Sequence, residues 1–224
     1  MVEIELGWSL HKRLELLVPL QTDPNAKVYD TEIEFTERKI QLPVIRIPIG
    51  LPKYRLINGR TSSLQLEWLS QNPDKPNDFF TADIEKEELQ EIQHQLLRQL
   101  INEKDLLPYF EKTEHKQTGY LILDNNGFVL NGNRRLCTWR ELLKLNSQLY
   151  SHFEYINVIV LPPSDSKAID KLEGVLQVEK DIRADYSWHA LANMFLARMK
   201  LHGLNEKNLA EIYDLTESEV KKYL

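Results

Sequence analysis

A glycine, an amide and two basic side chains follow one another at Gly132-Asn133-Arg134-Arg135, directly before a helix-like pattern. The apolar residues after this motif recur at helical spacing, at Leu136, Trp139, Leu142 and Leu143. A helix N-terminus offers unpaired N–H groups and a partial positive charge, which suit an anion such as phosphate. Arginines in a first turn oppose the helix dipole, so two of them indicate an anion that they hold. We therefore predict an anion site here.

The elements before this motif must place it at a junction between a strand and a helix. Residues 120–123 are an apolar run, residues 124–127 read Asp-Asn-Asn-Gly, and residues 128–130 are again apolar. Asn-Gly readily adopts the positive φ angles of a tight hairpin turn. The sequence therefore predicts a hairpin, a glycine-containing loop and then a helix.

A second basic stretch contains Arg55, Asn58 and Arg60 around an Asn-Gly turn. Two arginines beside such a turn could hold an anion or a carboxylate. A hairpin turn with solvated arginines accounts for the same residues, because Asn-Gly is common in turns. Both interpretations stay open from the sequence.

A third motif, Glu179-Lys180-Asp181-Ile182-Arg183, lies near the end of a predicted helix. By itself it is explained by an ion pair between Glu179 and Arg183, which are four residues apart. The six histidines show no paired spacing that would indicate a metal site.

The composition is that of a water-soluble globular chain with a reduced cysteine. In 224 residues, 42% are hydrophobic and 28% charged, and no apolar run approaches the length of a membrane span. A single cysteine and the absence of a signal-peptide pattern predict a cytoplasmic protein without a membrane partner. The net charge of -6 disfavours broad attraction to nucleic acid, so DNA contacts would require a local basic patch or regions outside this chain.

The remaining chain alternates between predicted strands and helices. Residues 40–49 should form an edge strand or extended loop, because prolines stand at 43, 48 and 52. A long helix is expected at 81–104, an irregular stretch at 105–117, a buried strand at 155–161 and a helix capped by Ser164. A helix at 188–202 and a helix-turn-helix-like segment at 205–224 follow. Residues 204–224 contain three lysines and five acidic residues, a poor balance for holding DNA phosphates.

The order strand, DNNG turn, strand, GNRR, helix, strand, helix, EKDIR and helix-turn-helix resembles the ParB/sulfiredoxin-like fold. It is most similar to the ParB amino-terminal domain with its following helical domain. The resemblance covers roughly residues 118–224, whereas residues 1–117 match only loosely. It implies an α/β domain at 1–163, with a small mixed sheet and an N-terminal extension, and a helical domain at 164–224. Because the sequence stops inside the last helix, we expect a piece of a longer protein.

The resemblance also implies a nucleotide site. Gly132, Asn133, Arg134 and Arg135 would cradle the phosphates, while Thr118, Gly119 and Tyr120 would shape the base pocket. Glu179, Lys180 and Arg183 would add phosphate contacts, with Glu179 as the catalytic and metal-binding residue. The implied ligand is a nucleoside triphosphate, CTP or ATP, in a homodimer. Lys180 stands where the family usually has the asparagine that helps to hold Mg²⁺, so the resemblance leaves open whether a metal is bound.

The same motif argues against sulfiredoxin chemistry. That enzyme places its catalytic cysteine at the position of Asn133, and an amide cannot act as the thiolate. Cys137 lies two positions beyond the arginine pair and beside a predicted buried face, so we interpret it as a structural thiol.

Four functions follow from these motifs. The first is a ParB-like module that binds a nucleoside triphosphate, and could hydrolyse it, as a switch linked to DNA transactions. The second is a non-catalytic DNA-binding or assembly protein. The third is a ParB-fold nuclease, and the fourth a small-molecule kinase in which Arg55, Asn58 and Arg60 hold the acceptor.

Overall fold

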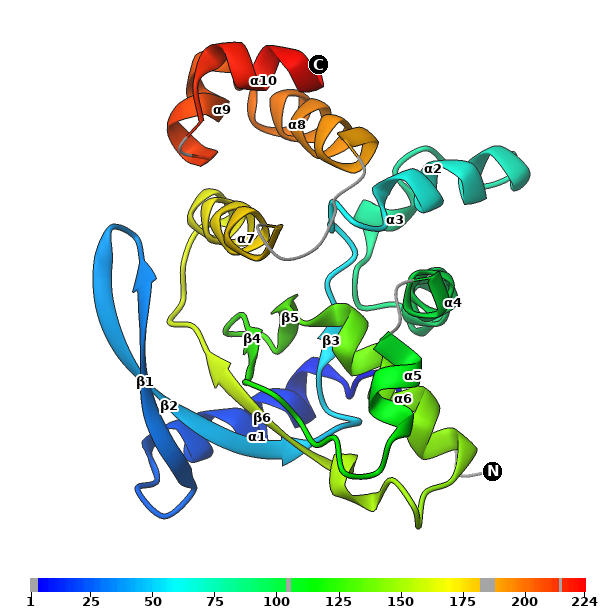
Figure 1. The fold of residues 1–224 in the computed structure, drawn as a ribbon, viewed down its shortest axis with the longest axis vertical. Coiled ribbons are helices and arrows are strands. Elements are labelled where there is room, and N and C mark those ends of the chain that lie inside the picture. Colours follow the sequence, from blue (N-terminus) through cyan, green and yellow to red (C-terminus); the bar gives the residue numbers. More distant parts are fainter. Residues whose placement is uncertain (1–3, 104–105, 182–187, 214) are drawn as a thin grey trace. The chain divides into compact units, whose positions relative to one another are not determined.

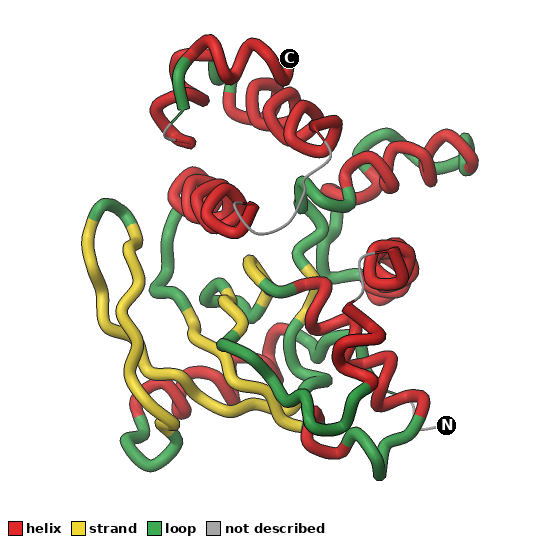
Figure 2. The backbone as a smooth tube through the Cα atoms, in the orientation of Figure 1, coloured by secondary structure: helices red, strands yellow, loops and turns green. Residues whose placement is uncertain are grey.

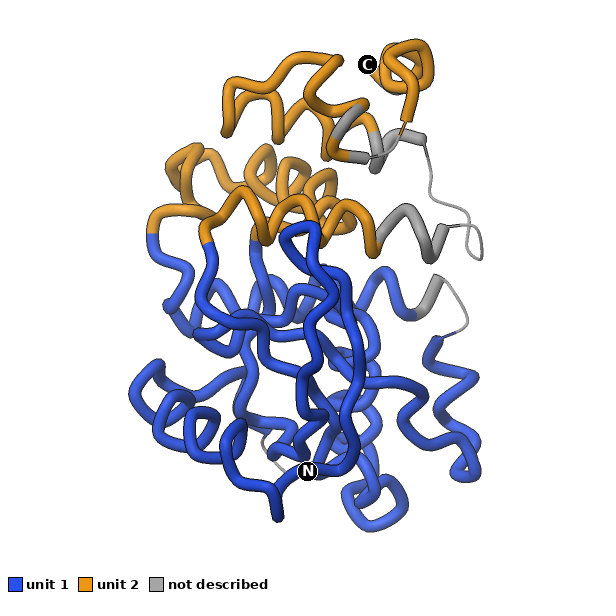
Figure 3. The backbone as a smooth tube through the Cα atoms, turned by 90° about the vertical axis from the view of Figure 1, so that its left-hand side faces the viewer, with its two compact units in different colours: residues 1–56, 83–164 blue, residues 57–82, 165–224 orange. Residues whose placement is uncertain are grey.

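A computed structural model of the chain describes residues 4–103, 106–181, 188–213 and 215–224 (Figure 1). The predicted α/β class is confirmed, with a mixed sheet and helices (Figure 2). The chain forms two compact units, one of residues 1–56 and 83–164 and the other of residues 57–82 and 165–224 (Figure 3). The sequence placed a domain boundary after residue 163, but it assigned residues 57–82 to the first domain. None of the described helices is long and apolar enough to cross a membrane.

The first unit is built on a sheet of six strands in the order β1-β2-β6-β4-β5-β3. The strands are β1 (Lys27–Phe35), β2 (Arg38–Pro48), β3 (Lys53–Tyr54), β4 (Leu121–Leu123), β5 (Phe128–Asn131) and β6 (Tyr155–Val160). The predicted buried strand is β6, which pairs antiparallel with β2 and parallel with β4. The predicted hairpin is β4 and β5, which are antiparallel.

Strand β2 is an interior strand, so the prediction of an edge strand or loop at 40–49 was wrong. Pro43 lies opposite Asp30, in the part of β2 that pairs only with β1. Strand β6 joins β2 from Ile45 onward and ends at Pro48. The missing N–H of Pro43 therefore costs no bond to β6, which is how an interior strand tolerates a proline.

The helical segments described in the first unit are α1 (Leu10–Thr22), α4 (Glu87–Glu103), α5 (Leu106–Glu111), α6 (Asn133–Leu145) and the 3₁₀ turn η1 (Ser151–Phe153). The long helix predicted from residue 81 begins only at Glu87. Residues 83–86 instead form a turn in which Asp83 accepts a hydrogen bond from the N–H of Glu85 (3.2 Å). This turn places the Glu85 carboxylate against two buried cations, which explains the later helix start.

Helix α5 lies in the stretch predicted to be irregular. Its Phe110 is 2% exposed and packs edge-on against Trp139 of α6, with ring centroids 5.6 Å apart. Trp139 also stacks on Phe153 at 5.4 Å. Six residues are too few for an isolated helix, so this helix depends on tertiary packing that local propensity does not reveal.

The described part of the second unit contains helices joined by loops: α2 (Ser62–Gln71), α3 (Phe79–Ala82), α7 (Ser166–Asp181), α8 (Trp188–His202), α9 (Glu206–Tyr213) and α10 (Glu217–Tyr223). Gly203 ends α8 with a φ of 63°, as the sequence predicted. The predicted cap Ser164 is wrong by one residue, because the Asp165 carboxylate accepts the N–H of Ala168 (2.7 Å). Buried Arg198 joins α8 to α7 through Asp170 (2.5 Å) and Glu173 (3.2 Å).

Replacing Thr216 by alanine should lower the free energy of unfolding of the second unit by about 1 kcal/mol. Thr216 forms a reciprocal capping box: its hydroxyl accepts the N–H of Glu219 (3.2 Å), and that carboxylate accepts the N–H of Thr216 (2.8 Å). Urea denaturation followed by circular dichroism measures the change. Ser218→Ala is the matched control on the same exposed turn, and an equal loss in both variants would contradict the capping argument.

Candidate functional site

The junction between β5 and α6 has the geometry that the sequence predicted. Gly132 is the N-cap of α6, with a φ of 108°. A Cβ atom at this position would lie 2.2 Å from Leu121 Cδ2, so both the backbone angle and the packing require glycine. No side chain caps the helix through Gly132, and its first turn contains no acidic residue. The α6 N-terminus therefore keeps N–H groups and a positive dipole end for an anion.

Arg135 connects this helix start to the segment predicted to shape a base pocket. Its guanidinium donates to the carbonyl of Thr118 (2.9 Å) and to that of Tyr120 (3.2 Å). Burial lowers the pKa of Arg135 to about 10, so the group stays positively charged at neutral pH. The structure thus brings together residues that are about 15 positions apart in the sequence. Arg135 acts first as a clamp on the backbone.

The segment 118–120 is fixed on its other side as well. Gln117 donates from its side chain to the carbonyls of Gly119 (2.9 Å) and Asn157 of β6 (2.8 Å). Gly119 has a φ of 71° and is exposed. The Tyr120 hydroxyl accepts a hydrogen bond from Thr31 of β1 (3.2 Å). An exposed, glycine-containing backbone segment therefore lies next to the start of α6.

Asn133 contributes a buried polar group to the junction. It is 4% exposed, and its side-chain N–H donates to the carbonyl of Val129 (2.9 Å). Its Oδ1 atom has no hydrogen-bond partner among the described residues. A buried acceptor without a partner is costly, so this oxygen can accept a donor from a bound molecule or water. Arg134 is half-buried, and its carbonyl accepts from Thr138 (2.9 Å).

The predicted acceptor residues are divided between the two units. Arg55 belongs to the first unit, whereas Asn58 and Arg60 belong to the second. The Asn58 side chain is buried and accepts the N–H of Arg60 (2.9 Å), so it shapes its own turn. Burial raises the pKa of the Asp124 carboxyl. Hydrogen bonds from the N–H groups of Phe128 and Asn126 counteract the rise, and so, to a lesser extent, do the positive charges of Arg55 and Arg13.

The third motif is described only in part. Glu179 and Lys180 lie in the last turn of α7, but their side chains fall outside the described part of the chain, and so does Arg183. Among the described residues, no group of three histidine, cysteine, aspartate or glutamate side chains could hold a metal ion.

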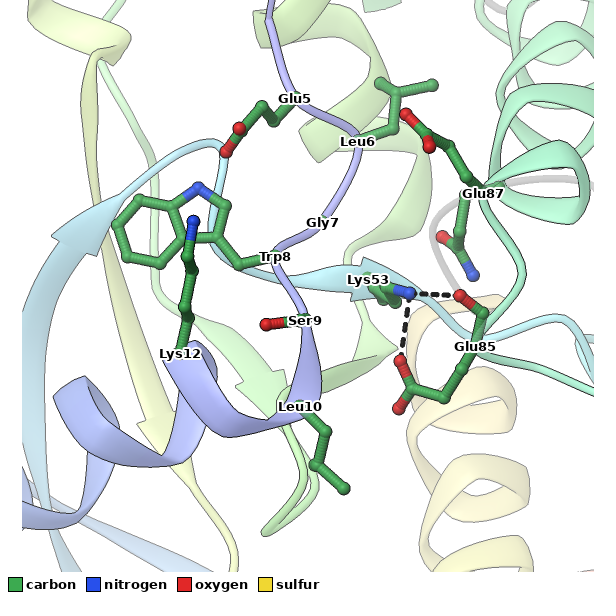
Figure 4. Close-up of a pocket in the computed structure, with 11 residues that line it drawn as sticks. Glu5, Leu6, Gly7, Trp8, Ser9, Leu10, Lys12, Lys53, Glu85 and Glu87 are labelled. Carbon is green, nitrogen blue, oxygen red and sulfur yellow. Dashed lines mark hydrogen bonds and ion pairs between the residues drawn. The ribbon is translucent and has the colours of Figure 1, made fainter.

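A buried ionic cluster at α1 was not predicted from the sequence. Arg13 is 0% exposed and its guanidinium binds both oxygens of Glu85, at 2.6 and 3.1 Å. Lys53 is 5% exposed and its ammonium lies 2.9 Å from the Glu85 carboxylate (Figure 4). Burial opposes ionisation of Glu85, but hydrogen bonds from both cations outweigh it and hold its pKa below the usual range. These three residues are separated widely in sequence and match no motif.

A buried hydrogen-bonded chain joins β3, α4 and α6. The Tyr54 hydroxyl lies 2.8 Å from His94 Nδ1, and His94 Nε2 lies 2.8 Å from Glu141. Burial lowers the pKa of His94, so the ring is neutral near pH 7. Cys137 lies 3.6 Å from the same ring, and burial raises the pKa of its thiol to about 12. An un-ionised thiol with no exposed surface has the properties of a core residue.

Comparison of the chain with models of protein families, with curated proteins and with solved structures gave no match in any of the three.

Proposed function

We propose that this chain is a ParB-like module that binds a nucleoside triphosphate at the start of α6. The observation that supports this proposal is the Arg135 clamp, which holds the Thr118 and Tyr120 carbonyls beside the uncapped helix N-terminus. Phosphate groups require N–H donors and positive charge, and a base requires a shaped backbone beside them. Both are present within one junction of the first unit.

Each residue has a distinct role in this proposal. The N–H groups of the first turn and the Arg134 guanidinium hold the phosphates. Arg135 positions residues 118–120 and adds its charge, while Gly132 lets the backbone approach the ligand closely. The Asn133 Oδ1 atom accepts a hydrogen bond from the ligand or from a water molecule bound with it. The bound nucleotide is CTP or ATP.

In its catalytic form, the proposed module hydrolyses the nucleotide that it holds at the start of α6. Water adds to the γ-phosphorus, the bond from that phosphorus to the bridging oxygen breaks, and the products are a nucleoside diphosphate and inorganic phosphate. Binding before hydrolysis and release after it would make the module a switch.

Thermal unfolding in the presence of each of ATP, CTP, GTP and UTP, with and without Mg²⁺, tests this proposal. A ligand at a hundred times its dissociation constant stabilises the native state by about 2.7 kcal/mol. For a chain of this size the midpoint should rise by roughly 5–10 °C with the preferred nucleotide. Inorganic triphosphate carries the charge of the nucleotide but no base, so a smaller rise in the midpoint with it than with the nucleotide indicates that the base is recognised. If none of the four nucleotides moves the midpoint, the proposal is wrong.

A further inference from the structure

Strand β1 lies at one edge of the sheet, and its outer side is not paired with any strand that the structure describes (Figure 1). It is nine residues long and contains no proline, and its one described partner is β2. In an edge strand every second residue directs its N–H and C=O groups away from the neighbouring strand. The other edge strand, β3, has only two residues. The backbone of β1 is therefore a template for a further strand.

Most of β1 belongs to a two-stranded ribbon. A bulge at Val28 interrupts the pairing with β2, which is regular over residues 29–35. Strand β6 pairs with residues 45–48 of β2, so in the described sheet residues 38–44 of β2 pair with β1 alone. Two strands by themselves are marginally stable in water, whereas three strands with a buried face can be stable. A third strand on the outer side of β1 would therefore stabilise the ribbon.

The ribbon already has the conformation that an added strand requires. Thr36 and Glu37 have φ angles of 52° and 63°, the two positive values that a type I′ hairpin turn needs. Phe35, directly before the turn, is 3% exposed, and the Thr31 hydroxyl donates to that of Tyr120 (3.2 Å). Because β1 is ordered before a partner arrives, little of its conformational entropy is lost on binding.

The exposed face of β1 has a row of carboxylates. Asp30, Glu32 and Glu34 stand at alternate positions, and all three side chains are exposed. Asp30 pairs with Lys27 (2.8 Å) and Glu32 with Lys39 (3.0 Å), whereas Glu34 forms no ion pair with a residue that the structure describes. The side chains in both pairs are at least 40% exposed, and such pairs contribute little to stability. The carboxylates can therefore bind the cations of a partner.

This row disfavours a second copy of β1 and favours a basic strand. When two copies of β1 pair antiparallel over most of the ribbon, side chains of the same face lie opposite one another, and these include carboxylates of both copies. Like charges directly opposite each other are destabilising. A strand with lysine or arginine at alternate positions places a cation against each carboxylate instead.

We propose that the outer side of β1 binds an extended basic segment of another protein, which adds a strand to the sheet. Main-chain hydrogen bonds to residues 29–35 hold the segment, as in other cases of strand addition. Lysine or arginine side chains at every second position lie against Asp30, Glu32 and Glu34, and β-branched residues between them favour the extended backbone. This surface is independent of the nucleotide site proposed at α6.

Fluorescence anisotropy tests the proposal with a labelled peptide, Thr-Lys-Val-Lys-Val-Lys-Thr, which is blocked at both ends. In about 50 mM salt the peptide should bind saturably to the whole chain. It should also slow the exchange of amide hydrogens within residues 29–35. A second peptide, with proline in place of both valines, has the same charge but lacks two N–H groups of a strand. It should bind about ten-fold more weakly or worse.

Glu34→Lys reverses one charge of the row on an exposed side chain, so the variant keeps the fold. It should bind the valine peptide about five-fold more weakly. Glu91→Lys makes the same change in net charge at an exposed position of α4 and is the matched control. This variant should bind the peptide nearly as well as the unaltered chain does.

The proposal is overturned if the valine peptide does not bind, if both peptides bind equally, or if the two variants bind the valine peptide equally well. Slower amide exchange along residues 38–44 in place of residues 29–35 would also overturn it, because the segment would then pair with β2. Sedimentation of the chain without peptide gives the last test. Self-association that protects the amides of residues 29–35 would mean that a second copy occupies this edge, and the proposal would be wrong.

Discussion

Glu85→Gln should lower the free energy of unfolding of the first unit by about 3 kcal/mol. The substitution keeps the shape of the side chain but removes the one carboxylate, among the residues that the structure describes, that pairs with buried Arg13 and Lys53. Removing one partner of a buried ion pair leaves uncompensated charge, which is more costly than the pair is worth. Glu85 is itself 36% exposed, so water recovers part of the loss and the effect lies near the low end of the usual range.

Urea denaturation of the two variants Glu85→Gln and Glu87→Gln at pH 7 measures this effect. Glu87 is two residues away, carries the same charge and forms no described ion pair, so its substitution should change stability by less than about 0.5 kcal/mol. Similar losses in both variants would show that Arg13 and Lys53 do not depend on Glu85.

The same carboxylate makes a pH-dependent contribution. The pKa of Glu85 is lowered in the folded chain, so its stabilisation is present above the pKa of the unfolded chain. It is lost as the pH falls through the lower, folded value, that is, below about pH 4.5. The Glu85→Gln variant lacks this carboxylate, so its free energy of unfolding should decrease less steeply as the pH falls from about 5 to about 3. If the free energy of unfolding depends on pH equally in the variant and the unaltered chain, Glu85 does not make this contribution.

Arg134→Ala should reduce by about half or more the rise in melting temperature that the preferred nucleoside triphosphate produces. In the proposed site this guanidinium holds the phosphates, and charge-assisted hydrogen bonds to charged groups contribute about 1.5–3 kcal/mol each. That loss corresponds to roughly a ten- to hundred-fold weaker complex. Lys144→Ala is the matched control, since it removes a positive charge at the other end of α6. If the nucleotide raises the melting temperature of both variants equally, Arg134 does not take part in the proposed site.

Arg135→Lys separates charge from geometry at the clamp. Lysine keeps the positive charge but cannot hold the Thr118 and Tyr120 carbonyls with a planar fork. We expect nucleotide binding to weaken about ten-fold, with faster amide hydrogen exchange at Gly119 and Tyr120. Weaker binding without faster exchange would mean that Arg135 acts on the ligand directly and not through the backbone.

Local patterns determined much of the fold. Alternation, turn residues and helical spacing located the β4–β5 hairpin, strand β6 and helices α6 to α10. The roles of Gly132 before α6 and of Gly203 at the end of α8 were predicted for the same reason, because each backbone conformation is dictated by neighbours in sequence. Interior pairing of β2 and the short helix α5 were not found, because both depend on partners far along the chain.

The sequence by itself predicts an anion site at the start of α6, since a glycine and two arginines that begin an amphipathic helix are a local signal, and this site stays a prediction. It did determine that a strand, a glycine and then a helix follow one another here. Only the tertiary structure decided what those arginines contact, and it assigned Arg135 to the carbonyls of a segment 15 to 17 residues earlier. It also assembled Arg13, Lys53 and Glu85 into one cluster. Charge balance in a buried cluster depends on distances between remote residues, and those distances have no signature in local sequence.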